Sequence, residues 1–361
     1  MKAILVAQDF APSQALEMLT RKLIDNGHEV WAFLAHGKSM SGDQGIQTQI
    51  NDSDVVITGI SSSPELSAVE REAIQLAISA DVPFCCYADS FGALNRPWFQ
   101  ELLPMAARLF VINESEAEAA AELFTSSQKP EIVVSGNPAW EKFAFPELTR
   151  ERVRELLGIG SSELVIMSPG IKDLVLNILL WGTIIEAASG TDVLGMLRHD
   201  VRVICSLHPG DPNDPQLYQS LTNGDREGLQ IEIIPASKMK GSEMLPGIDL
   251  VIESFSTIGI EAAHQRIPVI ACLTRLARHR YYQQSQRHDW PPYEMGAARV
   301  FKNDGSTDLA SIISNMLWSS ADLRSDMVQN LQDRQAKAYP QPAALGSAVS
   351  IMADSIERIK R

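Results

Sequence analysis

Short apolar runs alternate with helix-length segments along most of this chain of 361 residues. The runs are four to seven residues long and lack the polar alternation of a half-exposed strand, so we interpret each as a strand buried on both faces. The segments between them, such as 13–26 and 64–80, carry apolar residues at helical spacing. Strand and helix in alternation predict a parallel sheet with helices on both faces. The strands predicted in the first half are 2–7, 29–35, 54–60, 83–88, 109–112 and 131–135.

An aromatic stretch at 140–145 interrupts the alternation, which then starts again. A single hydrophobic core stops growing near ~250–300 residues, so a chain of this length favours two cores. We therefore expect an α/β protein with two facing Rossmann-like domains, at residues 1–146 and 150–340, and a last helix in 341–361. Ligands of such sheets bind beyond the carboxyl ends of the strands, so the expected site is the cleft between the domains. The strands predicted in the second half are 164–168, 201–207, 231–234, 250–253 and 269–272.

Composition and charge narrow the classes of function. The formal net charge of −14 argues against nucleic-acid binding, which uses a basic surface. No apolar run approaches the ~18 residues of a membrane span, and the first run is too short for a signal peptide. The four cysteines have neither metal-ligand spacing nor the pattern of a disulfide framework. We therefore expect a soluble, cytoplasmic protein.

The strongest motif is a polar turn that follows the predicted strand 250–253. Ser254, Ser256 and Thr257 open a helix there, and helix N-termini with hydroxyl side chains suit a phosphate. Glu261 follows one helical turn later on the same face, where its carboxylate would accept the hydroxyls of a ribose. The alternative is that Ser256 or Thr257 only caps the helix and that Glu261 is solvated.

Three further positions suit a ligand crevice. His208 follows the strand 201–207, and Pro209 stops that strand, so the imidazole is a candidate hydrogen-bond donor to a phosphate. Gly136 and Gly170 also come directly after predicted strands, where glycine permits a turn or a close ligand approach. The Arg-rich segment 275–287 is either a solvated loop or a flap over an anion.

These motifs, in this order, resemble the GT-B superfamily, particularly the non-hydrolysing UDP-N-acetylglucosamine 2-epimerases and related surface-carbohydrate glycosyltransferases. The resemblance implies that His208, Ser256 and Thr257 contact a diphosphate, that Glu261 holds the ribose, and that the last helix crosses back onto the first domain. It is compatible with a homodimer. The residues that carry it are Gly136-Asn-Pro138, His208-Pro209, Asp249, Ser254-Phe-Ser-Thr257, Glu261-Ala262, Pro268-Val-Ile270, Tyr293-Glu-Met-Gly296 and Tyr339-Pro-Gln-Pro342.

The chain departs from the epimerases in its first domain. Where they carry an Arg and a Lys after the first strand, this chain has Asp9-Phe-Ala-Pro-Ser-Gln. Where they carry a catalytic Asp, it has Ile60-Ser-Ser-Ser, and in place of a His-x-Glu stretch it offers only Asp89. The resemblance therefore disfavours an epimerase and favours a glycosyltransferase that shares the donor site. Asp89 and Asp9, both at strand ends, are the candidate bases for the acceptor hydroxyl, although both suit turn caps equally well.

The sequence thus predicts a metal-independent glycosyltransferase that moves a sugar from a nucleotide-sugar donor, with UDP favoured, to an unknown acceptor hydroxyl. No D-x-D pair or metal-ligand cluster is present, and no Gly-rich dinucleotide fingerprint follows the first strand, so we expect no bound cofactor. Two alternatives stay open: a UDP-sugar 2-epimerase or hydrolase, and a GT-B-shaped binding protein without catalysis.

Overall fold

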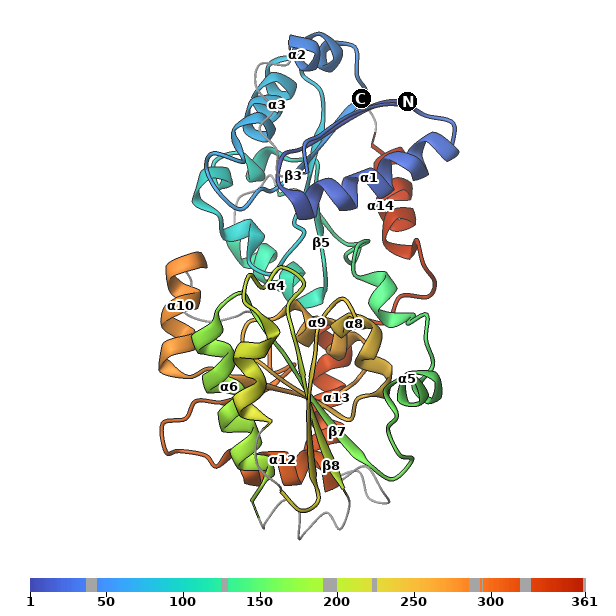
Figure 1. The fold of residues 1–361 in the computed structure, drawn as a ribbon. Helices are drawn as coiled ribbons and strands as arrows, with labels where there is room; N and C mark the ends of the chain where they lie inside the picture. The colour runs from blue at the N-terminus through green and yellow to red at the C-terminus, as the bar shows by residue number, and fades with distance from the viewer. Residues whose placement is uncertain are drawn as a thin grey trace. The chain divides into compact units, whose positions relative to one another are not determined.

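The computed structural model describes residues 1–36, 44–124, 129–190, 200–222, 226–285, 293, 295–318 and 326–359. The chain divides into two compact units (Figure 1). Unit 1 comprises Met1–Lys142 together with Pro340–Arg361, and unit 2 comprises Phe143–Tyr339.

Unit 1 is built on a six-stranded parallel sheet with the strand order β2-β1-β3-β4-β5-β6. Its strands are β1 (Lys2–Ala7), β2 (Glu29–Leu34), β3 (Val55–Gly59), β4 (Phe84–Tyr87), β5 (Arg108–Val111) and β6 (Glu131–Val134). Its helices are α1 (Phe10–Asp25), α2 (Gln44–Asn51), α3 (Ala68–Ser79), α4 (Glu114–Leu123) and α14 (Ser347–Glu357), with short 3₁₀ helices at η1 (Ala93–Asn95), η2 (Pro97–Phe99) and η3 (Leu103–Met105). The 3₁₀ helix η4 (Glu141–Ala144) contains the point where the chain passes from unit 1 to unit 2.

The sheet of unit 1 is buried on both faces, as the apolar runs predict. In β1, Ile4 and Val6 face one core, whereas Ala3, Leu5 and Ala7 face the other. This division follows from the alternation of side chains along a strand. Two strands differ from the prediction: β2 and β6 lie at the two edges of the sheet and have no buried residue, and each pairs with one strand only.

The last helix belongs to unit 1, where α14 packs beside α1 (Figure 1). Its apolar residues Met352 and Ile356 join the core of α1 and β1. Polar contacts fasten both ends. Glu141 accepts hydrogen bonds from the Gly346 and Ala348 N–H groups at 2.7 and 2.6 Å, and Arg108 donates to the Ser355 hydroxyl at 2.8 Å.

Unit 2 contains a second six-stranded parallel sheet, ordered β12-β11-β10-β7-β8-β9. Its strands are β7 (Leu164–Pro169), β8 (Val201–Ser206), β9 (Leu229–Ile234), β10 (Leu250–Glu253), β11 (Val269–Cys272) and β12 (Arg299–Phe301). Its helices are α5 (Arg150–Leu157), α6 (Leu174–Ala188), η5 (Pro215–Leu221), α8 (Gly241–Met244), η6 (Leu245–Gly247), α9 (Thr257–His264), α10 (Arg275–Ser285), α12 (Leu309–Trp318) and α13 (Asp326–Ala338).

The strand order of unit 2 places its first strand, β7, in the middle of the sheet. From β7 the chain moves outward through β8 and β9, then returns to the other side of β7 and moves outward through β10, β11 and β12. The strand order therefore reverses between β7 and β10. In open parallel sheets this switch point leaves a crevice at the carboxyl ends of the strands.

None of the helices within the described ranges is long and apolar enough to cross a membrane.

Candidate functional site

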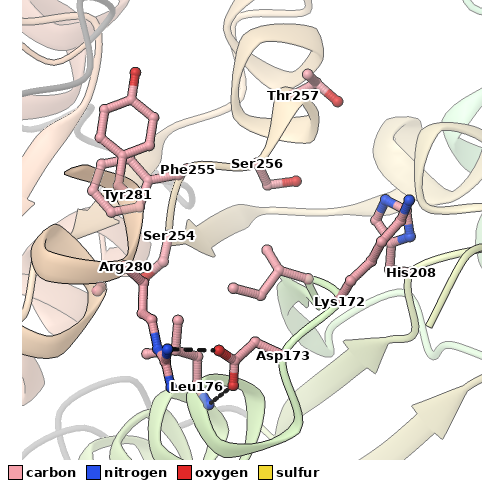
Figure 2. A pocket seen from close by; sticks show the side chains of 12 residues that line it. Lys172, Asp173, Leu176, His208, Ser254, Phe255, Ser256, Thr257, Arg280 and Tyr281 are labelled. Atoms are coloured by element: carbon pink, nitrogen blue, oxygen red, sulfur yellow. Dashed lines mark hydrogen bonds and ion pairs between the residues drawn. The ribbon is translucent and has the colours of Figure 1, made fainter. Parts of the chain in front are cut away.

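A cavity of about 320 Å³ lies in unit 2 at the switch point between β7 and β10 (Figure 2). The loops after β7, β8 and β10 line it, and α10 closes one side. Figure 2 shows the α9 N-terminus above the cavity, Arg280 at the lower left with Asp173 beside it at the bottom, and Lys172 with His208 on the right. The lining residues are Ile171, Lys172, Asp173, Leu176, His208, Ser254, Phe255, Ser256, Thr257, Ala277, Arg280 and Tyr281.

The turn after β10 has an unusual backbone. Phe255 has a φ of +56°, a left-handed conformation that costs free energy for a bulky residue. Its ring stacks on Tyr281 with 4.2 Å between the centroids and 4° between the planes. Ser256 has extended backbone angles and caps α9, because its hydroxyl accepts from the Ile258 N–H at 3.3 Å.

A buried carboxylate holds this turn from behind. Glu253 is fully buried, accepts from the Ser256 N–H at 2.6 Å and also accepts from the Tyr293 hydroxyl. Burial raises the pKa of Glu253 to about 7, and these two hydrogen bonds oppose that rise. The Tyr293 hydroxyl in turn accepts from the Phe255 N–H at 3.2 Å. The hydrogen bonds to Glu253 and Tyr293 stabilise the left-handed turn and engage two of its N–H groups, those of Phe255 and Ser256.

The donors that the turn presents are therefore fewer than its sequence suggests. The Ser254 hydroxyl is directed inward, since it donates to the Cys272 carbonyl at 2.7 Å. Ser256 and Thr257 line the cavity, and the N–H of Thr257 belongs to the first helical turn, whose donors have no acceptor within the helix. The positive end of the α9 dipole lies at the same place.

Lys172 brings a positive charge to the cavity and was not singled out by the sequence patterns. It comes two residues after Gly170, which does not line the cavity itself. A Cβ on Gly170 would lie 3.0 Å from the Trp181 ring and 3.2 Å from the Ser206 carbonyl, so this glycine serves packing. A Cβ on Gly210 would lie 2.8 Å from Lys172 Cε, so Gly210 leaves room for the lysine.

A polar brace joins the loops that carry Lys172 and His208. Asn177 accepts from the Ile171 N–H at 2.8 Å and donates to the Ile171 carbonyl at 2.8 Å. It also donates to the Tyr218 hydroxyl at 3.2 Å, and that hydroxyl donates to Asp211 at 2.7 Å. Both loops are thus anchored to the buried side chains beneath them.

His208 presents a neutral imidazole. Its Nδ1 accepts from the Gly210 N–H at 2.9 Å, which places the ring proton on Nε2. Burial lowers the pKa of His208, and the positive charge of Lys172 lowers it further. At neutral pH, Nε2–H is therefore a hydrogen-bond donor that carries no charge.

Besides Gly170, two predicted donor-site residues lie outside this cavity. Glu261 is on α9 and 9% exposed, but it does not line the cavity, so its role at a ribose stays a prediction. Gly136 belongs to unit 1, has a φ of +85° and donates its N–H to the Val111 carbonyl at 3.3 Å. Its neighbour Asn137 donates to the main-chain oxygen of Asp89 at 2.8 Å, which brings this turn and the Asp89 loop together.

The two candidate bases, both in unit 1, have different surroundings. Asp89 is 6% exposed and lies 3.8 Å from the Arg96 guanidinium. Burial raises the pKa of Asp89 to about 6, and the charge of Arg96 opposes that rise. Asp9, in contrast, caps α1: it accepts from the Phe10 N–H at 2.7 Å and from the Ser62 N–H and hydroxyl at 3.1 and 2.5 Å. Its carboxylate therefore stabilises a helix end and a loop.

The sequence patterns did not single out a third carboxylate of unit 1. Glu70 on α3 is fully buried and accepts from the Gln8 N–H, the Ser61 N–H and the Ser61 hydroxyl at 3.2, 3.0 and 2.7 Å. Burial raises the pKa of Glu70 to about 7. The signal was a charged residue on the apolar face of a helix, since Glu70 shares the buried side of α3 with Ala73, Ile74 and Ala77.

The Arg-rich segment divides between two surfaces. Arg280 and Tyr281 line the cavity, and the Arg280 guanidinium lies 3.5 Å from the Asp173 carboxylate. Arg275 and Arg278 line a different hollow. Arg287, Trp290 and Glu294 lie outside the described residues.

Comparisons with known proteins were made in sequence and in structure. No family model matches the chain, and no curated protein matches it in sequence. Solved structures match it over nearly its whole length.

Three of these structures illustrate the match. The UDP-GlcNAc 2-epimerase from Neisseria meningitidis, bound to UDP-GlcNAc, matches with a TM-score of 0.56 and 14% identity, covering 99% of this chain and 100% of the other. A glycosyltransferase from Rickettsia africae matches with a TM-score of 0.56 and 13% identity over 99% of both chains. HepE from Anabaena, in complex with UDP, matches with a TM-score of 0.55 and 12% identity, covering 99% and 100%. The predicted architecture is thus confirmed: the chain has the two-domain α/β GT-B fold of these proteins.

Proposed function

We propose that the chain is a glycosyltransferase that binds the diphosphate of a nucleotide-sugar in the unit 2 cavity and transfers the sugar to an acceptor hydroxyl. The proposal rests on the convergence, at the β7/β10 switch point, of groups that can donate hydrogen bonds to a phosphate. Lys172, His208 and the N-terminus of α9 all border one cavity of about 320 Å³, which is at the lower end of the range for ligand sites.

The charges around the cavity suit a diphosphate. Lys172 supplies a positive charge, whereas the charge of Arg280 is partly balanced by Asp173 at 3.5 Å. The neutral His208 and the hydroxyls of Ser256 and Thr257 add directed hydrogen bonds. When the bond between the sugar and the diphosphate breaks, the leaving group gains negative charge, and these prearranged donors stabilise it.

The solved structures support a nucleotide-sugar ligand by analogy. The epimerase of Neisseria meningitidis is bound to UDP-GlcNAc, and HepE of Anabaena is in complex with UDP or UDP-glucose. We therefore propose UDP as the favoured nucleotide of the donor.

Asp89 of unit 1 is the proposed base for the acceptor. A general base works best when its pKa lies near the operating pH, and burial raises the pKa of Asp89 to about 6. It would take the proton of the acceptor hydroxyl as the acceptor oxygen bonds to the anomeric carbon and the diphosphate oxygen leaves. Asp9 is a weaker candidate, because its carboxylate already caps α1.

The second candidate is an epimerase or hydrolase that acts on the same donor. It is favoured by the likeness to the Neisseria epimerase and by the presence in unit 1 of two carboxyl groups, Asp89 and Glu70, with raised pKa values. Release or inversion of the sugar without any acceptor would identify this activity. Nucleotide binding without turnover would instead indicate a GT-B-shaped binding protein.

Calorimetric titration with UDP, CMP, GDP, ADP and dTDP tests the donor site. We expect one nucleotide to bind, and Lys172→Gln to weaken it about 10- to 100-fold, since a charge-assisted hydrogen bond contributes ~1.5–3 kcal/mol. Lys337→Gln removes the same charge from an exposed site on α13 and should change the affinity less than about twofold. If no nucleotide binds, or if both variants bind equally well, the cavity is not a diphosphate site.

A further inference from the structure

A second cavity, of about 280 Å³, lies beside the first, between α6 and the beginning of α10. The two cavities share Leu176, Ser254 and Ala277 as common wall residues. The second is mostly apolar: three leucines and Thr183 form its α6 side, and Phe301 of β12 closes it. The nucleotide chemistry proposed above makes no use of it.

The α6 side of this cavity opens to the surface. Leu179 lines the cavity and is nevertheless 53% exposed. One turn earlier, Val175 is 54% exposed. In its 15 residues α6 carries a single ionisable side chain, Glu186, so the first two turns present an apolar surface to water. Exposed apolar surface next to a cavity indicates a binding site for an apolar group.

Positive charge surrounds the other side of the opening. Arg275 lines the apolar cavity and also an adjoining hollow, which is bordered by Arg278, His279 and Lys302. Asp304 is the one carboxylate among the described residues that line this hollow. Hydrogen bonds from Ser306 hold the pKa of Asp304 below its usual value, so it is ionised and balances only part of the charge. A local positive charge on a chain with a net charge of −14 favours an anion.

We propose that this second cavity binds the single apolar chain of an anionic amphiphile, a lipid phosphate, whose phosphate is held by Arg275 and Lys302. Arg275 lines both the apolar cavity and the basic hollow, so it lies where the chain of such a ligand meets its head group. A guanidinium also matches the geometry of a phosphate with two parallel hydrogen bonds. This site is separate from the donor site, and either assignment can fail without the other.

A series of alkyl phosphates tests the apolar part of the site. Hexyl, octyl and decyl phosphate are titrated calorimetrically into the full-length protein below their micellar concentrations. Affinity should rise roughly fourfold for each methylene that becomes buried, until the cavity is filled. Inorganic phosphate and uncharged decyl maltoside should each bind at least about tenfold more weakly than decyl phosphate. Equal affinity along the series, or equal binding of decyl maltoside, would overturn the proposal.

Three variants locate the binding. Leu179→Asn should lower the affinity for decyl phosphate about tenfold and reduce its dependence on chain length. Arg275→Gln should lower the affinity for all alkyl phosphates about tenfold. Val175→Asn is the matched control, because Val175 is equally exposed on α6 but does not line the cavity, and it should change the affinity less than about twofold.

Two outcomes of these measurements contradict the proposal in specific ways. Equal losses in Leu179→Asn and Val175→Asn would mean a general apolar surface. The protein's mass, measured by light scattering, could double as the protein concentration rises and return to the monomer value in Leu179→Asn. That result would mean that a second copy of the chain covers α6. Titration of the same variants with UDP reports separately on the donor site, where all three should behave like the parent protein.

Discussion

Replacing Glu253 with glutamine should remove part of the pH dependence of the free energy of unfolding. Burial raises the pKa of Glu253 in the folded chain to about 7, compared with the ordinary value of 4.5. Between these values the folded chain retains a proton that the unfolded chain releases. The stabilising contribution is therefore complete below pH 4.5 and is lost as the pH rises through 7.

The size of the effect follows from this difference in pKa. One pKa unit corresponds to about 1.4 kcal/mol, so the parent protein should lose about 2 to 3 kcal/mol of stability through Glu253 between pH 5 and pH 8. Glutamine has nearly the shape and hydrogen-bonding groups of the protonated acid and does not titrate. Glu253→Gln should therefore lie within about 1 kcal/mol of the parent at pH 5 and be the more stable protein at pH 8.

Urea denaturation at pH 5 and pH 8 measures this difference. Glu70 and Asp89 also have raised pKa values, so they too lower the stability of the folded chain as the pH rises. Both residues are present in the parent and in the variant, so their contributions cancel in the comparison. Glu227→Gln, at an exposed carboxylate of unit 2, is the control and should follow the parent at both values of pH. If Glu253→Gln loses as much stability as the parent between pH 5 and pH 8, the carboxylate is not protonated in the folded chain and the reasoning fails.

Two further predictions concern packing and catalysis. Gly259→Ala should lower the melting temperature, with a cost of about 1–3 kcal/mol, because its Cβ would lie 2.9 Å from the fixed Glu253 carboxylate. Gly182→Ala, which meets no atom within 4 Å inside α6, should instead raise stability by about 0.5–1 kcal/mol; an equal response of the two variants would contradict the packing argument. Asp89→Asn should reduce acceptor-dependent turnover by about 100-fold or more and abolish the rise in rate near pH 6, while UDP affinity measured by calorimetry stays unchanged; a retained pH profile would remove Asp89 as the base.

Local sequence patterns predicted most of the strands and helices, because each kind of element has its own spacing of apolar residues. The run at 2–7 matches β1, and the turn at 254–257 opens α9 as expected. The burial of the edge strands β2 and β6 was not predicted, since their apolar residues resemble those of a central strand but have a neighbouring strand on one side only. The two-domain GT-B architecture was also predicted correctly, because two successive strand–helix series exceed what one core can hold.

The sequence by itself determined most of the strands and helices, the succession of two α/β halves and the polar turn after β10. Its apolar runs did not predict β12, and the segment expected to be a loop at 275–287 begins as the helix α10. Only the tertiary structure decided which donors that turn presents. Glu253 and Tyr293 are 40 residues apart, yet together they engage the N–H groups of Phe255 and Ser256. Lys172 and His208 follow the paired strands β7 and β8, and the turn after β10 reaches the same cavity because the strand order reverses beside β7. Periodicity records whether a residue is buried, but it does not record which distant residue is its partner, and the donor set depends on those partners.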